Sequence, residues 1–323
     1  MKVLVTGGTG FIGSNLAIHL AKQGNKVTIC DNNSRGCLDK HMNNMIKEHN
    51  MNYVLCDLQD PSEFLKLETD YDEIYHLAAV NGTENFYKHP DVVLRVNILS
   101  VVNLLDWVVA HKMNSKLLFS SSSEAYAGTK NKPIPTPEDV DLCIEDINNP
   151  RFSYAVSKMA GEALFLNYAK KHDLDIRIVR YHNVYGPRMG YEHVMPQLSI
   201  RALKQENPFK IYGSVATRAF CHVSDAAKAT ALVMHSSEAK NQIVNVGNDQ
   251  EEIKIGTLAE MVIGLSGYEP DVEVEPEPVG CTMRRCPDIT KLNQLTGFKP
   301  EVSLQDGLKE LYDWYSKHVD KAV

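Results

Sequence analysis

Short apolar runs alternate with longer stretches of helical periodicity through the first half of this chain. The runs that predict β-strands are Val3–Thr6, Lys26–Cys30, Tyr53–Cys56, Glu73–Leu77, Lys116–Ser120 and Asp175–Val179. The stretches that predict helices between them include Gly13–Gln23, Val92–His111 and Ser153–Lys171. Regular alternation of this kind indicates a parallel sheet with helices on both faces. We therefore expect an α/β fold built on a doubly wound parallel sheet.

The alternation weakens after Gly186–Pro187, where the elements become shorter and proline more frequent. We expect residues 1–186 to form the sheet domain, with residues 215–244 returning to it. Within that returning segment, Ala219–His235 has the pattern of one more strand and helix. Residues 187–214 and 245–323 are then expected to form a smaller C-terminal α/β lobe that binds the substrate.

Composition excludes several classes of protein. The 323 residues carry a net charge of −7 and no strongly basic patch, so nucleic acid is not an expected partner. No apolar run approaches the roughly 20 residues that span a bilayer, and the chain starts directly with a strand pattern, so we expect a cytoplasmic protein. The chain has seven cysteines, an odd number, and no two of them have C-x-x-C spacing, which argues against a disulfide framework or a metal site. They are Cys30, Cys37, Cys56, Cys143, Cys221, Cys281 and Cys286.

A glycine-rich turn follows the first strand and opens the first helix. Gly7, Gly10 and Gly13 enclose Phe11 and Ile12. Glycine lets the backbone approach a pyrophosphate, and the helix N-terminus offers it unpaired N–H groups. With its strand and helix context, this motif predicts a dinucleotide-binding domain of the Rossmann type.

An acid at the end of the second strand predicts which dinucleotide binds. The Asp31 carboxylate can accept hydrogen bonds from the ribose hydroxyls of adenosine and would repel a 2′-phosphate, so NAD is favoured over NADP. Arg35 nearby weakens this preference. Later strand ends could border the same cofactor, although each is equally consistent with simple packing; they are Asp57 and Leu58 after the third strand, and Leu77, Ala78 and Ala79 after the fourth.

Tyr154 and Lys158 lie four residues apart in a helical stretch and therefore share one helix face. An ammonium about 5 Å from a phenolate stabilises it by roughly 3 kcal/mol at an effective dielectric near 20. That would bring the phenol pKa from about 10 to about 8, close to what a base needs at neutral pH. The serine run Ser120–Ser123 ends the preceding apolar strand, and one of its hydroxyls could bind the oxygen from which Tyr154 removes a proton.

Together these residues resemble the extended short-chain dehydrogenase/reductases, and more narrowly the NAD-dependent epimerase/dehydratase family that acts on nucleotide sugars. The resemblance covers nearly the whole chain. It includes the segment from Arg180 to Arg188 and the late segments Arg218–Phe220 and Arg284–Asp288.

The resemblance implies a role for each matching position. Ser122 would be the catalytic serine, Tyr154 the base, and Lys158 the residue that positions the nicotinamide ribose. Asn32, Asn97 and Tyr181 would join the NAD site. Ser123, Asn183, Arg218 and Arg285 would bind the substrate, a nucleotide-diphosphate sugar, with the arginines gripping phosphate oxygens in pairs. Family members often form homodimers through two helices per subunit, and Leu99, Val102 and Leu166 could face a partner or the core.

Two features depart from the family. The usual Val-Tyr-Gly after the serines is Ala125-Tyr126-Ala127 here, and the stretch from Pro187 to Pro196 is shorter than in typical 4-epimerases. Both departures lie near the expected sugar pocket.

The reaction depends on the fate of the ketone that forms when a sugar hydroxyl, usually at C4, is oxidised. Glu124 matches the proton-abstracting acid of family dehydratases, but Ser123 stands where their aspartate would be. UDP-glucuronate decarboxylases show a similar Ser-Glu, whereas the negative charge of Glu192 disfavours a substrate carboxylate. We place epimerisation first, dehydration or decarboxylation second, and release of the ketone by a plain 4-dehydrogenase third. A non-catalytic dinucleotide-binding redox sensor is the alternative from another class.

Overall fold

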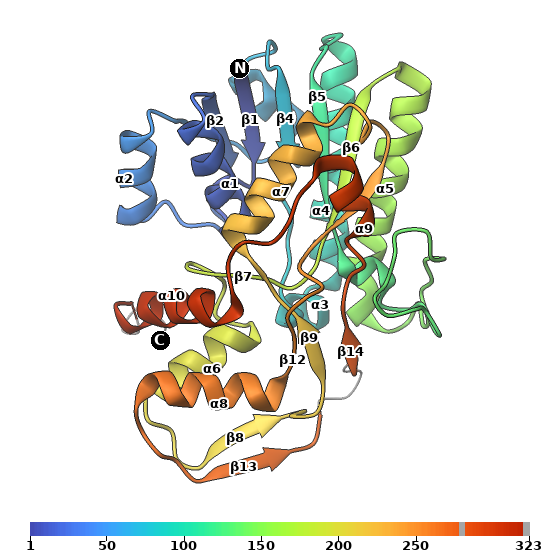
Figure 1. The fold of residues 1–323 in the computed structure, drawn as a ribbon. Helices are drawn as coiled ribbons and strands as arrows, with labels where there is room; N and C mark the ends of the chain where they lie inside the picture. The colour runs from blue at the N-terminus through green and yellow to red at the C-terminus, as the bar shows by residue number, and fades with distance from the viewer. Residues whose placement is uncertain (278–281, 319–323) are drawn as a thin grey trace.

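The computed structural model describes residues 1–277 and 282–318, and a seven-stranded parallel sheet forms its centre (Figure 1). The strand order is β3-β2-β1-β4-β5-β6-β11. The chain therefore winds outward from β1 to one edge and from β4 to the other, and the predicted Rossmann-type fold is confirmed. The strands are β1 (Lys2–Thr6), β2 (Lys26–Asp31), β3 (Asn52–Leu55), β4 (Glu73–His76), β5 (Lys116–Ser122), β6 (Asp175–Tyr181) and β11 (Ile243–Val246).

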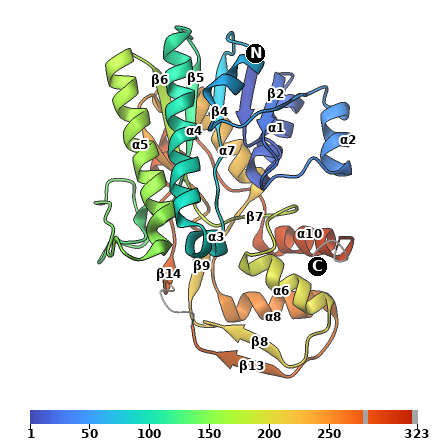
Figure 2. The same cartoon turned by 180° about the vertical axis from the view of Figure 1, so that it is seen from behind.

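Helices cover both faces of this sheet because successive strand residues point to opposite sides. In β1, Val3 and Val5 pack toward α1 and α7, whereas Leu4 between them packs toward α4 and α5. Figure 1 shows the first pair of helices in front of the sheet, and Figure 2 shows the second pair on the other face. Their bounds are α1 (Phe11–Lys22), α4 (Pro90–Ala110), α5 (Ser153–His172) and α7 (Val223–His235). Shorter helices border the sheet domain: α2 (Lys40–Glu48), α3 (Thr83–Lys88), α9 (Thr290–Thr296) and the 3-10 turns Pro61–Lys66, Ser123–Tyr126 and Pro150–Phe152.

A smaller lobe lies beyond the carboxyl ends of the strands, below the sheet in Figure 1. It has its own core, in which Phe209, Leu258, Leu308 and Tyr315 are buried together. The lobe's helices are α6 (Val194–Leu203), α8 (Ile255–Ser266) and α10 (Leu304–Ser316). Its strands are β8 (Phe209–Tyr212) with β13 (Val272–Glu275), and β9 (Thr217–Ala219) with β12 (Glu252–Lys254) and β14 (Arg284–Arg285).

One predicted strand is placed differently in the structure. The strand expected at the start of Ala219–His235 is only β10 (Cys221–His222), and it pairs with β7 (Val184–Tyr185) instead of joining the main sheet. The last strand of the main sheet is β11, which follows α7 and pairs with β6. It crosses the predicted boundary between residues 244 and 245.

Helix α4 is long and apolar enough to cross a membrane by length and composition, contrary to the expectation that no such segment exists. It lies against α5 on one face of the sheet, with Leu104, Leu105 and Val108 buried in the core (Figure 2). Among residues 1–277 and 282–318, every cysteine is a free thiol and no group of acids, histidines and cysteines could hold a metal ion. Cys281 lies outside the described residues.

Candidate active site

A cavity of about 1030 Å³ lies at the carboxyl ends of the strands, between the sheet and the smaller lobe. This is where open α/β sheets bind ligands, next to the point at which the strand order reverses. Most of the predicted site residues line this cavity. They are Gly7, Gly10, Phe11, Ile12, Gly13, Asp31, Asn32, Asp57, Leu58, Leu77, Ala78, Ala79, Ser122, Ser123, Glu124, Tyr154, Lys158, Tyr181, Asn183 and Arg285.

The glycine turn is packed too closely to admit side chains. Gly7 has φ +69°, and a Cβ on it would lie 2.7 Å from the backbone nitrogen of Ala78. A Cβ on Gly13 would lie 2.1 Å from the carbonyl oxygen of Gly7. The N-cap of α1 is Gly10, which makes no side-chain capping hydrogen bond. The first N–H groups of α1 are therefore left to bind an anion.

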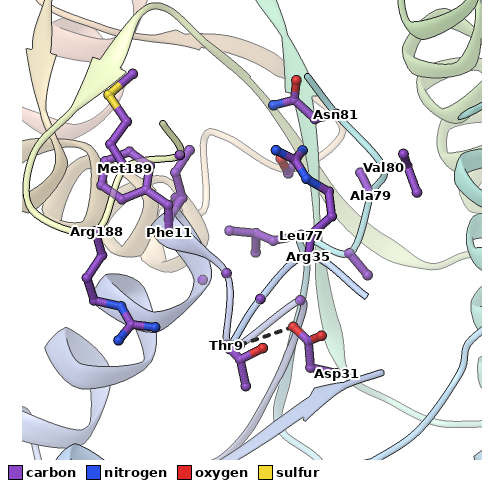
Figure 3. Close-up of a pocket in the computed structure, with 18 of the residues that line it drawn as sticks. Thr9, Phe11, Asp31, Arg35, Leu77, Ala79, Val80, Asn81, Arg188 and Met189 are labelled. Carbon is purple, nitrogen blue, oxygen red and sulfur yellow. Dashed lines mark hydrogen bonds between the residues drawn. The ribbon is translucent and has the colours of Figure 1, made fainter. Parts of the chain in front are cut away.

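Asp31 ends β2 beside this turn. Its two carboxylate oxygens accept hydrogen bonds from the backbone N–H group of Thr9, at 3.1 Å (Figure 3), and from that of Asn33, at 2.8 Å. Each oxygen keeps a lone pair for a ribose hydroxyl. An anion-binding turn and a fixed carboxylate in one cavity fit the pyrophosphate and the adenosine ribose of NAD.

Lys158 lies buried beneath Tyr154 on the same face of α5. Its Nζ donates to the carbonyl oxygen of Ser120 at 2.7 Å and lies 5.5 Å from the centre of the Tyr154 ring. Burial lowers the pKa of Lys158 to about 7, against a smaller opposing effect of Glu162. The predicted juxtaposition of the two side chains is therefore present.

The electrostatics of Tyr154 differ from the prediction. Burial raises the pKa of this phenol, the charge of Glu124 raises it further, and a hydrogen bond with Ser122 acts in the opposite direction. A lysine that is itself easily deprotonated gives the phenolate little support. The predicted lowering of the Tyr154 pKa by Lys158 is therefore absent.

Glu124 meets two guanidinium groups at the end of the cavity near Tyr154. Its carboxylate lies 2.8 Å from Nη1 of Arg285 and 3.9 Å from Nη2 of Arg151. Burial alone would raise the pKa of Glu124, but Arg285, Arg151 and Arg218 outweigh it and the pKa is lowered. Glu124 is therefore ionised at neutral pH. Arg151 was not among the predicted site residues, because nothing in its local sequence distinguishes it from a surface arginine.

Two predicted residues do not line the cavity. Asn97 is buried and binds both backbone groups of Val80, accepting at 2.7 Å and donating at 3.0 Å, and it also donates to Ser157. It holds the loop after β4 against α5, so its expected contact with NAD is indirect. Arg218 lies on β9 beside Arg285 of β14, and its Nη1 donates to the carbonyl oxygen of Thr217 at 2.7 Å.

A buried ion pair supports the serine-rich strand end from behind. Glu162 of α5 binds Nε and Nη2 of Arg180 at 2.8 and 2.7 Å, and it also accepts from Ser121. Nη1 of Arg180 donates to the hydroxyl of Tyr126 at 2.7 Å, which in turn donates to Asn245 at 2.9 Å. This network ties α5, β6 and β11 to the turn that carries Glu124.

Comparisons with known proteins agree with this geometry. The NAD dependent epimerase/dehydratase family model matches residues 3–247. The chain is 34% identical to a UDP-N-acetyl-alpha-D-glucosaminuronate decarboxylase of Bacillus cytotoxicus, over 97% of each chain. Its fold matches the UDP-N-acetylglucosamine 4-epimerase of Methanobrevibacter ruminantium with a TM-score of 0.86, 30% identity and 98% coverage of each chain.

A further structure shares the cofactor. The UDP-glucuronic acid 4-epimerase of Bacillus cereus, solved with NAD, matches with a TM-score of 0.84 and 26% identity, over 99% of this chain and all of the other. The fold and the family of this chain are thus those in which NAD-dependent catalysis on nucleotide sugars is found. The glycine turn, Asp31, Tyr154 and Lys158 are the residues of the chain that match it. The chain belongs to the NAD dependent epimerase/dehydratase family and is an NAD-dependent enzyme.

Proposed function

We propose that this enzyme is a decarboxylase of a nucleotide-linked uronate. It would oxidise the sugar at C4, release the C6 carboxylate as carbon dioxide, and reduce the ketone again, so that NAD is not consumed overall. Decarboxylation was the second of the reactions that the sequence left open. We now place it ahead of epimerisation, and UDP-glucuronate or its 2-acetamido analogue is the proposed substrate.

The observation that carries this proposal is the charge around Glu124. One carboxylate faces Arg285 and Arg151 within 4 Å, and Arg218 and Lys132 contribute positive charge nearby. Of these groups, Glu124 and Arg285 line the cavity, and the cations around the Glu124 carboxylate outnumber it. A surplus of positive charge in a largely buried site favours an anionic substrate group. Glu192, which the sequence set against a substrate carboxylate, lies between the cavity-lining residues Tyr191 and His193, and its charge is opposed by that of Arg35, which also lines the cavity.

The residues of the chain suit each step of this reaction. NAD bound in the cavity would take up the C4 hydride and return it, and its positive ring would supply the charge that favours the Tyr154 phenolate. Tyr154 would take the proton of the C4 hydroxyl while Ser122 binds the same oxygen. Arg285, which lines the cavity, would bind the C6 carboxylate in place of the phosphate oxygens that the family resemblance assigned to it. Glu124 would hold Arg285 in position, and Arg151 pairs with Glu124.

Oxidation at C4 makes the sugar a β-keto acid, and this is what allows the C5–C6 bond to break. The electron pair of that bond moves to C5 and is delocalised onto the C4 oxygen. Tyr154, now a neutral phenol, and Ser122 can both donate hydrogen bonds to that oxygen and stabilise its charge. C5 takes up a proton from water, the hydride returns to C4, and Tyr154 returns its proton to the C4 oxygen. The net reaction consumes one proton from water and releases one carbon dioxide.

Mass spectrometry of product mixtures tests this proposal. The purified enzyme would be incubated with UDP-glucuronate and UDP-N-acetylglucosaminuronate, and with UDP-glucose and UDP-N-acetylglucosamine as matched substrates without the carboxylate. We expect one of the acids to lose the mass of carbon dioxide and both uncharged sugars to remain unchanged. An unchanged mass with altered retention would instead identify an epimerase, and loss of water a dehydratase. Release of a ketone with NADH would indicate a dehydrogenase, and a bound cofactor without turnover a redox sensor.

We also propose that the enzyme is a homodimer that uses the outer faces of α4 and α5. These helices lie side by side on one face of the sheet (Figure 2). Leu99 and Val102 of α4 are only half-buried and lie outside the hydrophobic clusters of the core, which leaves them available to a second copy. A cytoplasmic location is consistent with the free thiols of the described cysteines.

A further inference from the structure

The segment that follows Asp31 folds back onto the glycine turn. We call residues 34–39 the roof loop. A Cβ on Gly36 would lie 2.1 Å from Oγ1 of Thr9 and 2.9 Å from the backbone nitrogen of Gly10, so the roof loop rests directly on the turn. At the start of the loop, Asn33 has φ +57° and accepts a hydrogen bond from Thr9. The roof loop therefore covers part of the turn that would bind the NAD pyrophosphate.

The far end of the roof loop is tied to the opposite wall of the cavity. Nη1 of Arg188 lies 2.8 Å from both carboxylate oxygens of Asp39, and its Nη2 donates to the carbonyl oxygen of Cys37 at 3.2 Å. The Arg188 side chain is 11% exposed, so this pair is shielded from water on one side. Nη1 is shared between the two carboxylate oxygens and Nη2 binds the backbone, so Arg188 holds the loop at two points where a simple ion pair would hold it at one.

Arg188 is itself anchored to the smaller lobe. It precedes α6 with φ +67°, and the neighbouring Met189 carbonyl accepts a hydrogen bond from the hydroxyl of Tyr315 in α10. The rings of Tyr191 and Tyr315 lie 5.6 Å apart in an edge-to-face contact. In Figure 3, Arg188 and Met189 lie on the side of the cavity away from Val80 and Asn81, with Phe11 beside them. The smaller lobe thus positions the Arg188 guanidinium against the roof loop.

We propose that Arg188 and Asp39 form a latch that keeps the roof loop on the glycine turn and so slows the exchange of NAD. For the dinucleotide to leave the turn, the roof loop has to lift, and lifting separates Asp39 from Arg188. Both are positioning residues that act on cofactor residence and take no part in the chemistry. The latch concerns only the binding of NAD, so the test of the latch and the test of the proposed decarboxylation can fail independently of each other.

The rate of NADH release from loaded enzyme tests the latch. NADH fluorescence would be followed by stopped flow after mixing with excess NAD, for wild type, Asp39→Ser, Arg188→Asn and the double variant. Serine retains the N-cap of α2 that Asp39 provides to Met42, and asparagine tolerates the left-handed backbone at position 188. We expect each single variant to release NADH about tenfold faster, and the double variant no faster than the singles.

A matched control removes a comparable pair elsewhere. Arg201 binds Glu206 through Nε and Nη2 at 2.9 and 3.0 Å, and neither residue lines the cavity. Arg201→Asn is expected to leave NADH release unchanged. Rates within twofold of wild type in either single variant, or multiplying effects in the double variant, would overturn the latch. If Arg188→Asn does not fold, Asp39→Asn replaces it, with release about threefold faster expected because only the charge is lost.

Discussion

Replacement of Tyr154 by phenylalanine is expected to lower kcat by about 10³-fold, because it removes the group that we propose takes the C4 proton. The ring should stay in position, since it stacks on Phe86 with centres 5.0 Å apart and planes 15° apart. Substrate affinity and NAD affinity should therefore change little. The measurement is a full rate analysis on the accepted nucleotide sugar, together with a fluorescence titration of cofactor binding.

A second buried tyrosine provides the control. Tyr71 lies in the core under β4 and does not line the cavity. Tyr71→Phe removes a phenol hydroxyl of the same kind, and we expect it to leave kcat unchanged. If Tyr154→Phe retained more than a tenth of wild-type activity, Tyr154 would not be the base.

Replacement of Glu162 by leucine is expected to lower the free energy of unfolding by about 3–5 kcal/mol, the usual cost of leaving one buried charge without its partner. The side chains of Glu162 and Arg180 are 5% and 3% exposed, and two hydrogen bonds of 2.8 and 2.7 Å join them. Once Glu162 is gone, the Arg180 guanidinium keeps, among the described residues, its hydrogen bonds to the Tyr126 hydroxyl and the Glu138 carbonyl. Denaturant unfolding followed by circular dichroism measures the change.

The double variant separates the destabilisation caused by an unpaired buried charge from the destabilisation caused by lost packing. Glu162→Leu combined with Arg180→Met leaves no unpaired ion, so we expect it to recover most of the lost stability. Recovery should stop short of wild type, because the hydroxyl of Tyr126 loses its donor. A single variant that costs less than about 1 kcal/mol would contradict the view that this pair supports the site.

Features set by local sequence could be predicted from the chain alone. The glycine turn, Asp31 at the end of β2, and the shared face of Tyr154 and Lys158 each depend on residues a few positions apart. The structure brings all of them to one cavity. The family resemblance added Ser122, Glu124, Asn183 and Arg285 by position, and these line the cavity too.

Features that depend on contacts between distant segments could not be predicted from the sequence. Arg188 and Asp39 are 149 residues apart, and Arg151 reaches Glu124 only because the turn before α5 folds beside the end of β5. The strand expected at the start of Ala219–His235 pairs outside the main sheet, and β11 was not predicted. Strand pairing is decided by tertiary neighbours, while the apolar pattern is the same in either sheet. The pKa of Tyr154 was expected to fall because the attraction of Lys158 was considered without the cost of burying both groups.

The most direct test of the central claim is the release of carbon dioxide from a UDP-linked uronate labelled in its C6 carboxylate. Labelled carbon dioxide would be trapped and compared with the nucleotide sugar consumed, in the presence of catalytic NAD only. We predict one carbon dioxide per sugar converted, with no net accumulation of NADH, and no labelled carbon dioxide from the Tyr154→Phe variant. Conversion of the sugar with the label retained in the product would contradict the proposal and identify the enzyme as an epimerase of uronates or of other nucleotide sugars.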